Sequence, residues 1–156
     1  LTLPLLDEML KNPRVVAVKN SSMPVQDIQL FRDRADGALA VFNGPDEQLL
    51  AGLSMGAIGG IGGTYGAMPR LYLKLKSLFD AQEMDKAMAL QNDICRLIYA
   101  FCGCQGSMYA VIKELLRRRG VQCGSVRPPL YPLQAADIPQ VDACEKLLKK
   151  TEQAWL

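Results

Sequence analysis

The stretch that decides the fold is Val15-Val16-Ala17-Val18-Lys19-Asn20-Ser21-Ser22, in which four apolar residues precede a lysine and three small polar residues. A short, continuous apolar run bounded by turn residues is typical of a strand that is buried on both faces of a parallel sheet. We therefore expect a strand over Val15–Lys19, with Lys19 at the point where the strand leaves the sheet. In parallel α/β proteins, active sites usually lie at the carboxyl ends of the strands.

Lys19 is a candidate nucleophile at this position. An amine attacks a carbonyl carbon only in its neutral form, and an ordinary lysine has a pKa of about 10.4. Apolar surroundings disfavour the ammonium ion and lower this pKa, which is how Schiff-base lysines arise. The alternative is a strand-end lysine that extends into solvent, and the octapeptide taken alone favours that alternative.

Composition limits the classes of function. The chain has 156 residues, of which 49% are hydrophobic and 22% charged, the ordinary mixture of a globular domain with a sizeable core. Its net charge of +2 gives no reason to expect a nucleic acid or a membrane surface as a partner. No apolar run approaches the length of a membrane-spanning helix, and the first residues do not resemble a signal peptide.

The cysteines and the absence of histidine narrow the chemistry further. Five cysteines, an odd number without paired spacing, indicate reduced thiols and a cytoplasmic location. Because the chain has no histidine, it cannot supply Ser-His or Cys-His catalysis. Cys102-Gly103-Cys104 lacks the two-residue spacing of a structural zinc site, so we expect no metal.

The pattern of a strand followed by a helix recurs along the first part of the chain. Further strands are expected at Ala38–Phe42 and Ala57–Gly63, and the second of these is rich in glycine. Helices are expected at Leu3–Lys11, at Met23–Arg34 and from Asp46 onward. Crossover connections of this length build a parallel sheet with helices outside it, as in a barrel or a doubly wound sheet.

After Thr64 the pattern becomes helical. The triplet Arg117-Arg118-Arg119 is expected to be a solvated helix end rather than a nucleic-acid site, because cations favour a helix C-terminus. We expect residues 1–66 to form barrel units and residues 67–156 to form the last barrel helix and a helical C-terminal extension. The expected helices cover residues 69–81, 83–101, 106–119 and 138–155.

Three parallel strands do not make a complete barrel. A (β/α)8 barrel requires eight strands and about 250 residues, and an isolated three-stranded parallel sheet would leave its edges and one face uncovered. We therefore predict an α/β fold that is the C-terminal part of a (β/α)8 TIM barrel, followed by a helical extension. The other strands, about five, are expected to precede Leu1 or to lie on another polypeptide.

Three features at successive strand ends carry a family resemblance. Lys19 is followed by Asn43-Gly44-Pro45-Asp46-Glu47 and then by Gly59-Gly60-Ile61-Gly62-Gly63-Thr64-Tyr65. In order and spacing, this set resembles the N-acetylneuraminate lyase and dihydrodipicolinate synthase family, a group of class I Schiff-base aldolases on a (β/α)8 barrel. The resemblance spans nearly the whole chain and includes Arg127-Pro128-Pro129.

The resemblance implies a role for each matching residue. Lys19 falls on the catalytic lysine that forms an imine with pyruvate, so no cofactor is implied. Other matching positions would bind the sugar-derived chain or line the floor near the imine. These substrate-binding positions are Ser21, Gly44, Asp46, Glu47, Gly62 and Gly63.

Asp46 and Glu47 have two explanations. Adjacent carboxylates at a helix N-terminus accept hydrogen bonds from several hydroxyls of a polyol, but they also stabilise a helix end without any ligand. Beside Lys19 the binding role is favoured, and it points to the lyase branch rather than the synthase branch. The lyase usually has a serine where this chain has Gly63 and a threonine where it has Ser21, which leaves the exact substrate open.

The implied function is a pyruvate-dependent carbon–carbon lyase of the N-acetylneuraminate lyase type. Dihydrodipicolinate synthase and a 2-keto-3-deoxy sugar-acid aldolase are the enzyme alternatives, and a non-catalytic half-barrel is the alternative of another class. The implied partners are a 2-keto acid such as pyruvate or sialic acid, the N-terminal half of the barrel, and further copies in a homo-oligomer, commonly a tetramer. Because the family's proton-shuttling tyrosine and carboxylate-binding loop would precede Leu1, we expect this chain alone to be inactive.

Overall fold

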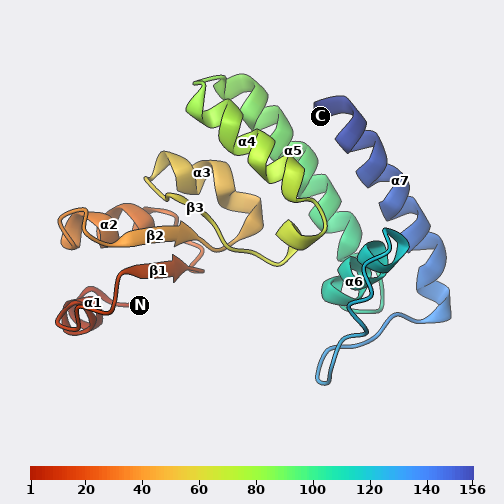
Figure 1. Cartoon of the computed structure of the whole chain (residues 1–156), viewed down its shortest axis with the longest axis horizontal. Helices are drawn as coiled ribbons and strands as arrows, with labels where there is room; N and C mark the ends of the chain where they lie inside the picture. The colour runs from red at the N-terminus through yellow and green to blue at the C-terminus, as the bar shows by residue number, and fades with distance from the viewer. The chain divides into compact units, whose positions relative to one another are not determined.

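The chain forms two compact units. The computed structural model describes all 156 residues, and they divide into Leu1–Gly62 and Gly63–Leu156. The first unit holds the β-sheet and the second is helical, as Figure 1 shows. The division between the two units therefore falls after residue 62. The sequence predicts the end of the barrel units at residue 66, and that boundary between barrel and extension remains a prediction.

The sheet of the first unit has three parallel strands in the order β1-β2-β3. They are β1 (Ala17–Asn20), β2 (Ala40–Asn43) and β3 (Gly59–Gly60). In Figure 1 the arrows of β1 and β2 lie side by side and point the same way. The predicted order of three parallel strands with intervening helices is therefore confirmed.

Helices α1 and α2 cover one face of this sheet. The Thr2 hydroxyl caps α1 by accepting a hydrogen bond from the Leu5 N–H, which satisfies one of the free donors at that helix end. The helical elements of the unit are α1 (Leu3–Leu10), α2 (Gln26–Arg34), the short 3₁₀ turn η1 (Asp46–Gln48) and α3 (Leu49–Ser54). The buried core consists of Leu6, Ile28, Phe31, Leu39, Val41 and Ala57.

The prediction that the first strand is buried on both faces is wrong for this chain. Val18 packs against the core, but Ala17 and Lys19 are exposed, and Val16 just before the strand is 65% exposed. Successive side chains of a strand point to opposite faces, and the helices of this unit pack on one face only. The apolar run therefore has one covered face, not two.

Two other elements are shorter than expected. β3 has two residues instead of the expected Ala57–Gly63, because glycines offer no side chains to pack along a strand. α2 begins at Gln26 rather than at the expected Met23, and the hydroxyl of Ser22 before it donates to the carboxylate of Asp27.

The second unit is built from four long helices, which confirms the predicted helical part. They are α4 (Pro69–Asp80), α5 (Met84–Phe101), α6 (Met108–Arg118) and α7 (Ile138–Trp155), with the 3₁₀ turns η2 (Thr64–Gly66) and η3 (Ala135–Asp137). Figure 1 shows α4 and α5 side by side. No helix of the chain has both the length and the apolar character needed to cross a bilayer.

The arginine triplet at the end of α6 is not simply a solvated helix end. Arg118 bonds carboxylates of Glu114 on its own helix and of Asp142 and Glu145 on α7. Arg119 donates to the carbonyl oxygen of Ala67 and to Glu152. Of the three arginines, only Arg117 is therefore solvated as expected. Arg118 and Arg119 bond acidic residues of α7, which are distant in the linear sequence.

Candidate functional site

Lys19 lies one residue before the end of its strand. It is in register with Phe42 of β2, which is in register with Gly59 of β3. Side chains of residues in register on parallel strands point to the same face. Lys19, Phe42 and Gly59 thus form one row across the sheet. Because Val18 packs into the core, this row lies on the opposite face, away from α1 and α2, with the Lys19 amine beside the Phe42 ring.

The neighbours of Lys19 are apolar on the side of β2. The Phe42 ring carbons lie 3.9 Å from the place where a Cβ atom at Gly59 would stand, so the ring lies toward the bare glycine strand. The amine itself is exposed, and no acidic side chain is bonded to it. An exposed amine beside an aromatic ring is accessible to a carbonyl compound on this face of the sheet.

The strand ends form a second row immediately beyond Lys19. Asn20, Asn43 and Gly60 are in register with one another, and the two asparagines are buried. Asn43 Nδ2 donates to the carbonyl oxygen of Pro45 at 2.6 Å. The buried amide thereby fixes the start of the loop that carries the predicted carboxylates.

Ser21 and Gly44 follow that row and pack against each other. The N–H of Gly44 donates to the Asn20 carbonyl oxygen at 2.7 Å, so this N–H is not available to a ligand. A Cβ atom at position 44 would lie 2.5 Å from both the Asn20 carbonyl oxygen and Ser21 Oγ. Glycine is therefore required here for close approach of the backbone, and Ser21 is exposed at the end of the strand.

Asp46 and Glu47 open the 3₁₀ turn η1 directly after the second strand end. Asp46 is buried, with 7% of its surface exposed, whereas Glu47 is exposed. The structure therefore brings Lys19, Ser21, Gly44, Asp46 and Glu47 to the same edge of one sheet.

Gly62 and Gly63 follow β3, and Gly63 begins the second unit. The ring of Tyr109, from the first turn of α6, fills the space beside Gly63. A Cβ atom at position 63 would lie 2.7 Å from Cε1 and 2.9 Å from the hydroxyl oxygen of Tyr109. Sequence reasoning missed Tyr109, because nothing in the linear pattern places α6 against residue 63.

Two of the five cysteines, Cys104 and Cys144, are poor candidates for a second nucleophile. Burial raises the pKa of the Cys144 thiol to about 11 and also raises the pKa of Cys104. Both thiols are therefore protonated at neutral pH, in which form they are poor nucleophiles. No three acidic or cysteine side chains of the chain lie close enough together to hold a metal ion.

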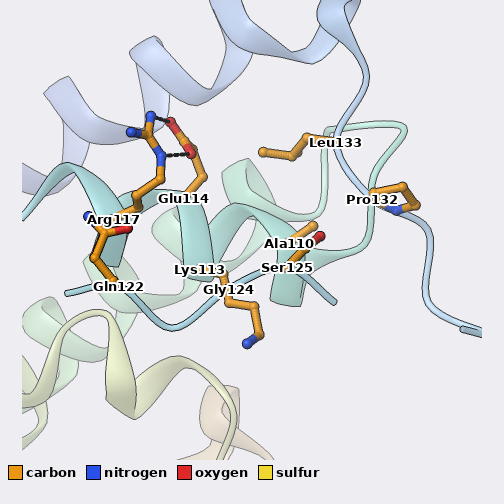
Figure 2. Close-up of a pocket in the computed structure, with 9 residues that line it drawn as sticks. All are labelled: Ala110, Lys113, Glu114, Arg117, Gln122, Gly124, Ser125, Pro132 and Leu133. Carbon is orange, nitrogen blue, oxygen red and sulfur yellow. Dashed lines mark hydrogen bonds and ion pairs between the residues drawn. The ribbon is translucent and has the colours of Figure 1, made fainter. Parts of the chain in front are cut away.

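A pocket of about 290 Å³ lies in the second unit, between α6 and the segment that follows it. Two cationic side chains, Arg117 and Lys113, line this pocket. In Figure 2 Arg117 makes two hydrogen bonds to Glu114, whereas Lys113 extends away from this pair. Lys113 Nζ donates to the Cys123 carbonyl oxygen at 2.7 Å. None of the residues predicted to bind substrate lines this pocket, and its cations are occupied by protein acceptors.

Comparison with known proteins agrees with this arrangement of strands and loops. Residues 1–149 match the dihydrodipicolinate synthetase family. The N-acetylneuraminate lyase of Mediterraneibacter gnavus is 46% identical over 157 aligned positions, which cover 100% of this chain and 50% of that lyase.

Two solved structures have the same fold over nearly the whole chain. The sialic acid aldolase of Ruminococcus gnavus, solved as a catalytic lysine mutant, superposes with a TM-score of 0.97 at 46% identity and covers 99% of this chain and 51% of its own. The N-acetylneuraminate lyase of Fusobacterium nucleatum complexed with pyruvate gives a TM-score of 0.83 at 26% identity, covering 97% of this chain and 49% of its own.

The chain thus spans about half the length of the relatives that it matches. This extent confirms the prediction of half of a (β/α)8 barrel with a helical C-terminal part. With the family match over residues 1–149 and the relatives at 46% identity, the chain belongs to the dihydrodipicolinate synthetase family.

Proposed function

We propose that the protein containing this chain is a class I aldolase that cleaves N-acetylneuraminate through an imine on Lys19. The observation that carries the proposal is the position of Lys19 in the row Lys19–Phe42–Gly59, beside the carboxyl ends of three parallel strands and on the face that the helices leave open. The lyase of M. gnavus, at 46% identity, supports this substrate over others of the family.

The reaction needs only one nucleophile from this chain. The neutral amine of Lys19 attacks the keto carbon, the keto oxygen leaves as water, and a protonated imine forms. The bond that then breaks joins the carbon next to the imine carbon to the hydroxyl-bearing carbon beyond it. Its electron pair moves toward the imine nitrogen, which yields an enamine and the aldehyde N-acetylmannosamine. The enamine takes up a proton, and hydrolysis of the imine releases pyruvate and the free amine.

A general base must remove the hydroxyl proton of the carbon that becomes the aldehyde. We assign this base, and the group that holds the pyruvate carboxylate, to the other half of the barrel. No separate cofactor takes part, because the protonated imine itself is the electron sink.

The polar residues at the strand ends would hold the sugar end of the substrate. Asp46 and Glu47 accept hydrogen bonds from its hydroxyls, with Asp46 fixed by burial and Glu47 facing solvent. We assign a substrate-binding role to Ser21 and to the backbone of Gly44, Gly62 and Gly63 as well. The Gly44 carbonyl oxygen is the polar group that this residue has to offer, since its N–H is bonded to Asn20.

The test compares three reactions in a protein with a complete barrel, whether its other half lies on the same polypeptide or on a second one. These are cleavage of N-acetylneuraminate, cleavage of 2-keto-3-deoxygluconate, and condensation of pyruvate with aspartate semialdehyde. We expect the first to have the highest kcat/KM, and Lys19→Ala to abolish it. Lys11→Ala is the matched control, because this exposed lysine bonds only Glu8 on α1. Preference for either other substrate would contradict the proposal.

The cellular setting is proposed on the same grounds. Five cysteines without a disulfide suit a reducing, cytoplasmic compartment. We also propose a homo-oligomer, a tetramer by family resemblance, to be checked by light scattering on the complete protein.

A further inference from the structure

We infer that Asn43 is a positioning residue, whose buried side-chain amide sets the turn that presents Asp46 and Glu47 to the sugar end of the substrate. The inference rests on the proposed function. It gives a role in substrate selection to an amide that acts through the neighbouring turn rather than by touching substrate. The residues that carry it all lie within Leu1–Gly62.

The Asn43 side chain holds the carbonyl group that starts this turn. Asn43 Nδ2 donates to the Pro45 carbonyl oxygen at 2.6 Å, and the Gln48 N–H donates to the same oxygen at 3.1 Å. The bond from Gln48 closes the 3₁₀ turn η1, whose first two residues are Asp46 and Glu47. The Pro45 carbonyl group is therefore held twice, once by its own turn and once by the end of β2.

The chemistry of the Pro45 carbonyl group fixes which way the Asn43 amide points. A carbonyl oxygen only accepts hydrogen bonds, so the NH2 group of the amide faces it and the Oδ1 atom faces away. Oδ1 is buried without a hydrogen-bond partner in the chain, and it lies beside Gly52 of α3. A buried acceptor without a partner lowers stability, and an apolar residue would avoid that cost. We therefore attribute the asparagine to the bond that its NH2 group makes.

Gly52 leaves the space that the Asn43 amide occupies. A Cβ atom at position 52 would lie 2.4 Å from Asn43 Oδ1 and 2.8 Å from Asn43 Cβ. Gly52 is itself buried, within the helix α3 that follows η1. The amide therefore fits between the carbonyl group of Pro45 and the backbone of α3, and its position is closely determined.

The backbone of Asn43 is anchored to both neighbouring strands. Asn43 is in register with Asn20 of β1 and with Gly60 of β3. Its carbonyl oxygen accepts from the Ile61 N–H at 2.9 Å, and only 1% of the residue is exposed. A side chain that starts from a strand paired on both edges has a well-defined origin. The turn is thereby fixed relative to the strand end that carries Lys19.

The expected consequence is selective for one substrate. A turn that is held in place presents its carboxylates without first being ordered, so binding the sugar end costs less free energy. Pyruvate has no sugar end, and its capture by Lys19 does not use the turn. In the condensation direction, the proposed aldolase joins pyruvate to N-acetylmannosamine. Loosening the turn should therefore raise KM for N-acetylmannosamine and leave KM for pyruvate unchanged.

The decisive variant is Asn43→Asp in the complete protein, because it keeps the size of the side chain and replaces the NH2 donor with an oxygen atom. We expect KM for N-acetylmannosamine to rise roughly three- to tenfold, as for the loss of one hydrogen bond. KM for pyruvate and borohydride trapping on Lys19 should be unaltered. Asn92→Asp is the matched control, since Asn92 is exposed on α5, and it should leave both constants unchanged.

Gly52→Ala tests the same contact from the opposite side and keeps the asparagine. Its methyl group meets the amide, so we expect the same selective rise in KM for N-acetylmannosamine. Asn43→Ala clears the space, and adding Gly52→Ala to it should raise this KM by less than about twofold further. If Asn43→Asp does not fold, Gly52→Ala decides by the same two constants. An unchanged KM for N-acetylmannosamine, or equal increases in both constants, would overturn the inference.

Trapping separates this inference from the proposed function. If the unaltered protein traps pyruvate on Lys19 and Asn43→Asp leaves KM for N-acetylmannosamine unchanged, the positioning role fails and the aldolase proposal stands. If the variant folds but loses trapping, Asn43 acts on the strand end of Lys19 rather than on the turn, and the inference is overturned. If the unaltered protein traps nothing, the proposed function fails and the inference fails with it.

Discussion

At the scale of single residues, Gly44 shows how tightly the candidate site is built. Its α-carbon faces the end of β1, where an added methyl group would meet a backbone carbonyl oxygen and the Cα of Ser21, the latter at 2.8 Å. Neither obstacle is the end of a flexible side chain. We expect Gly44→Ala to destabilise the protein by about 1–3 kcal/mol, because overpacking forces the backbone to shift.

The control for this prediction is Gly66→Ala. Nothing lies within 4 Å of a Cβ atom at that position. This substitution should be neutral or should stabilise by up to about 1 kcal/mol, because alanine lowers the entropy of the unfolded chain. Thermal unfolding of both variants checks the difference, and equal melting temperatures would show that the close approach at Gly44 is unimportant.

The residue scale also shows what the sequence can and cannot reveal. Lys19 could be placed at a strand end, because a short apolar run with a polar end has a characteristic pattern. Tyr109 could not be placed, because its contact with Gly63 depends on how a helix folds back far along the chain. Likewise, the role of Gly44 in close packing was visible only once its neighbours on β1 were known.

At the scale of elements, the end of α6 is joined to α7 by charge. The Arg118 side chain is 19% exposed and bonds three carboxylates, whereas the Arg117 side chain is 58% exposed and bonds Glu114 alone. Arg118→Ala should cost about 1–3 kcal/mol, because half-buried carboxylates lose a charged partner. Arg117→Ala should cost less than about 1 kcal/mol, as exposed ion pairs do. Chemical denaturation of the two variants measures both costs, and equal values would contradict the structure.

The same cluster predicts a dependence on pH. Hydrogen bonds from Arg117, and then from Arg118, lower the pKa of the Glu114 carboxyl to about 2 from its ordinary value of 4.5. A carboxyl whose pKa is lowered by folding stabilises the protein above its ordinary pKa, and this contribution is lost as the pH falls. The free energy of unfolding should therefore drop between about pH 4.5 and pH 2.

Glu114→Gln isolates this contribution. The variant should be less stable than the unaltered protein at pH 7, and the two curves should converge near pH 2. The effect should be modest, because the carboxylate is partly exposed to solvent. The test is to measure the melting temperatures of both proteins across this pH range. Parallel curves of melting temperature against pH would show that Glu114 does not contribute to the pH dependence of stability.

Secondary structure was predictable here to the extent that it depends on local signals. The parallel order of the strands followed from their connection lengths, and four helices followed from apolar spacing and their caps. Strand burial was not predictable in the same way, because a run such as Val15–Val18 does not reveal which face receives helices. The arginine triplet was misjudged for a related reason: its acidic partners on α7 are distant in sequence.

At the scale of the whole molecule, the chain is half of a barrel. It carries the lysine and the sugar-binding carboxylates of the proposed site, and we assign the general base to the other half. The isolated chain should therefore not cleave N-acetylneuraminate, and adding the other half of the barrel should restore cleavage. Pyruvate release by the pure chain alone would contradict this division of roles.

The most direct test of the account is reductive trapping on Lys19. A complete barrel is incubated with pyruvate and borohydride, and intact and peptide masses are then measured. We predict one reduced pyruvate per chain on the peptide that contains Lys19, with none in Lys19→Ala and an unchanged adduct in Lys11→Ala. An adduct on another residue, or no adduct in the unaltered protein, would contradict the central claim that Lys19 captures the keto acid.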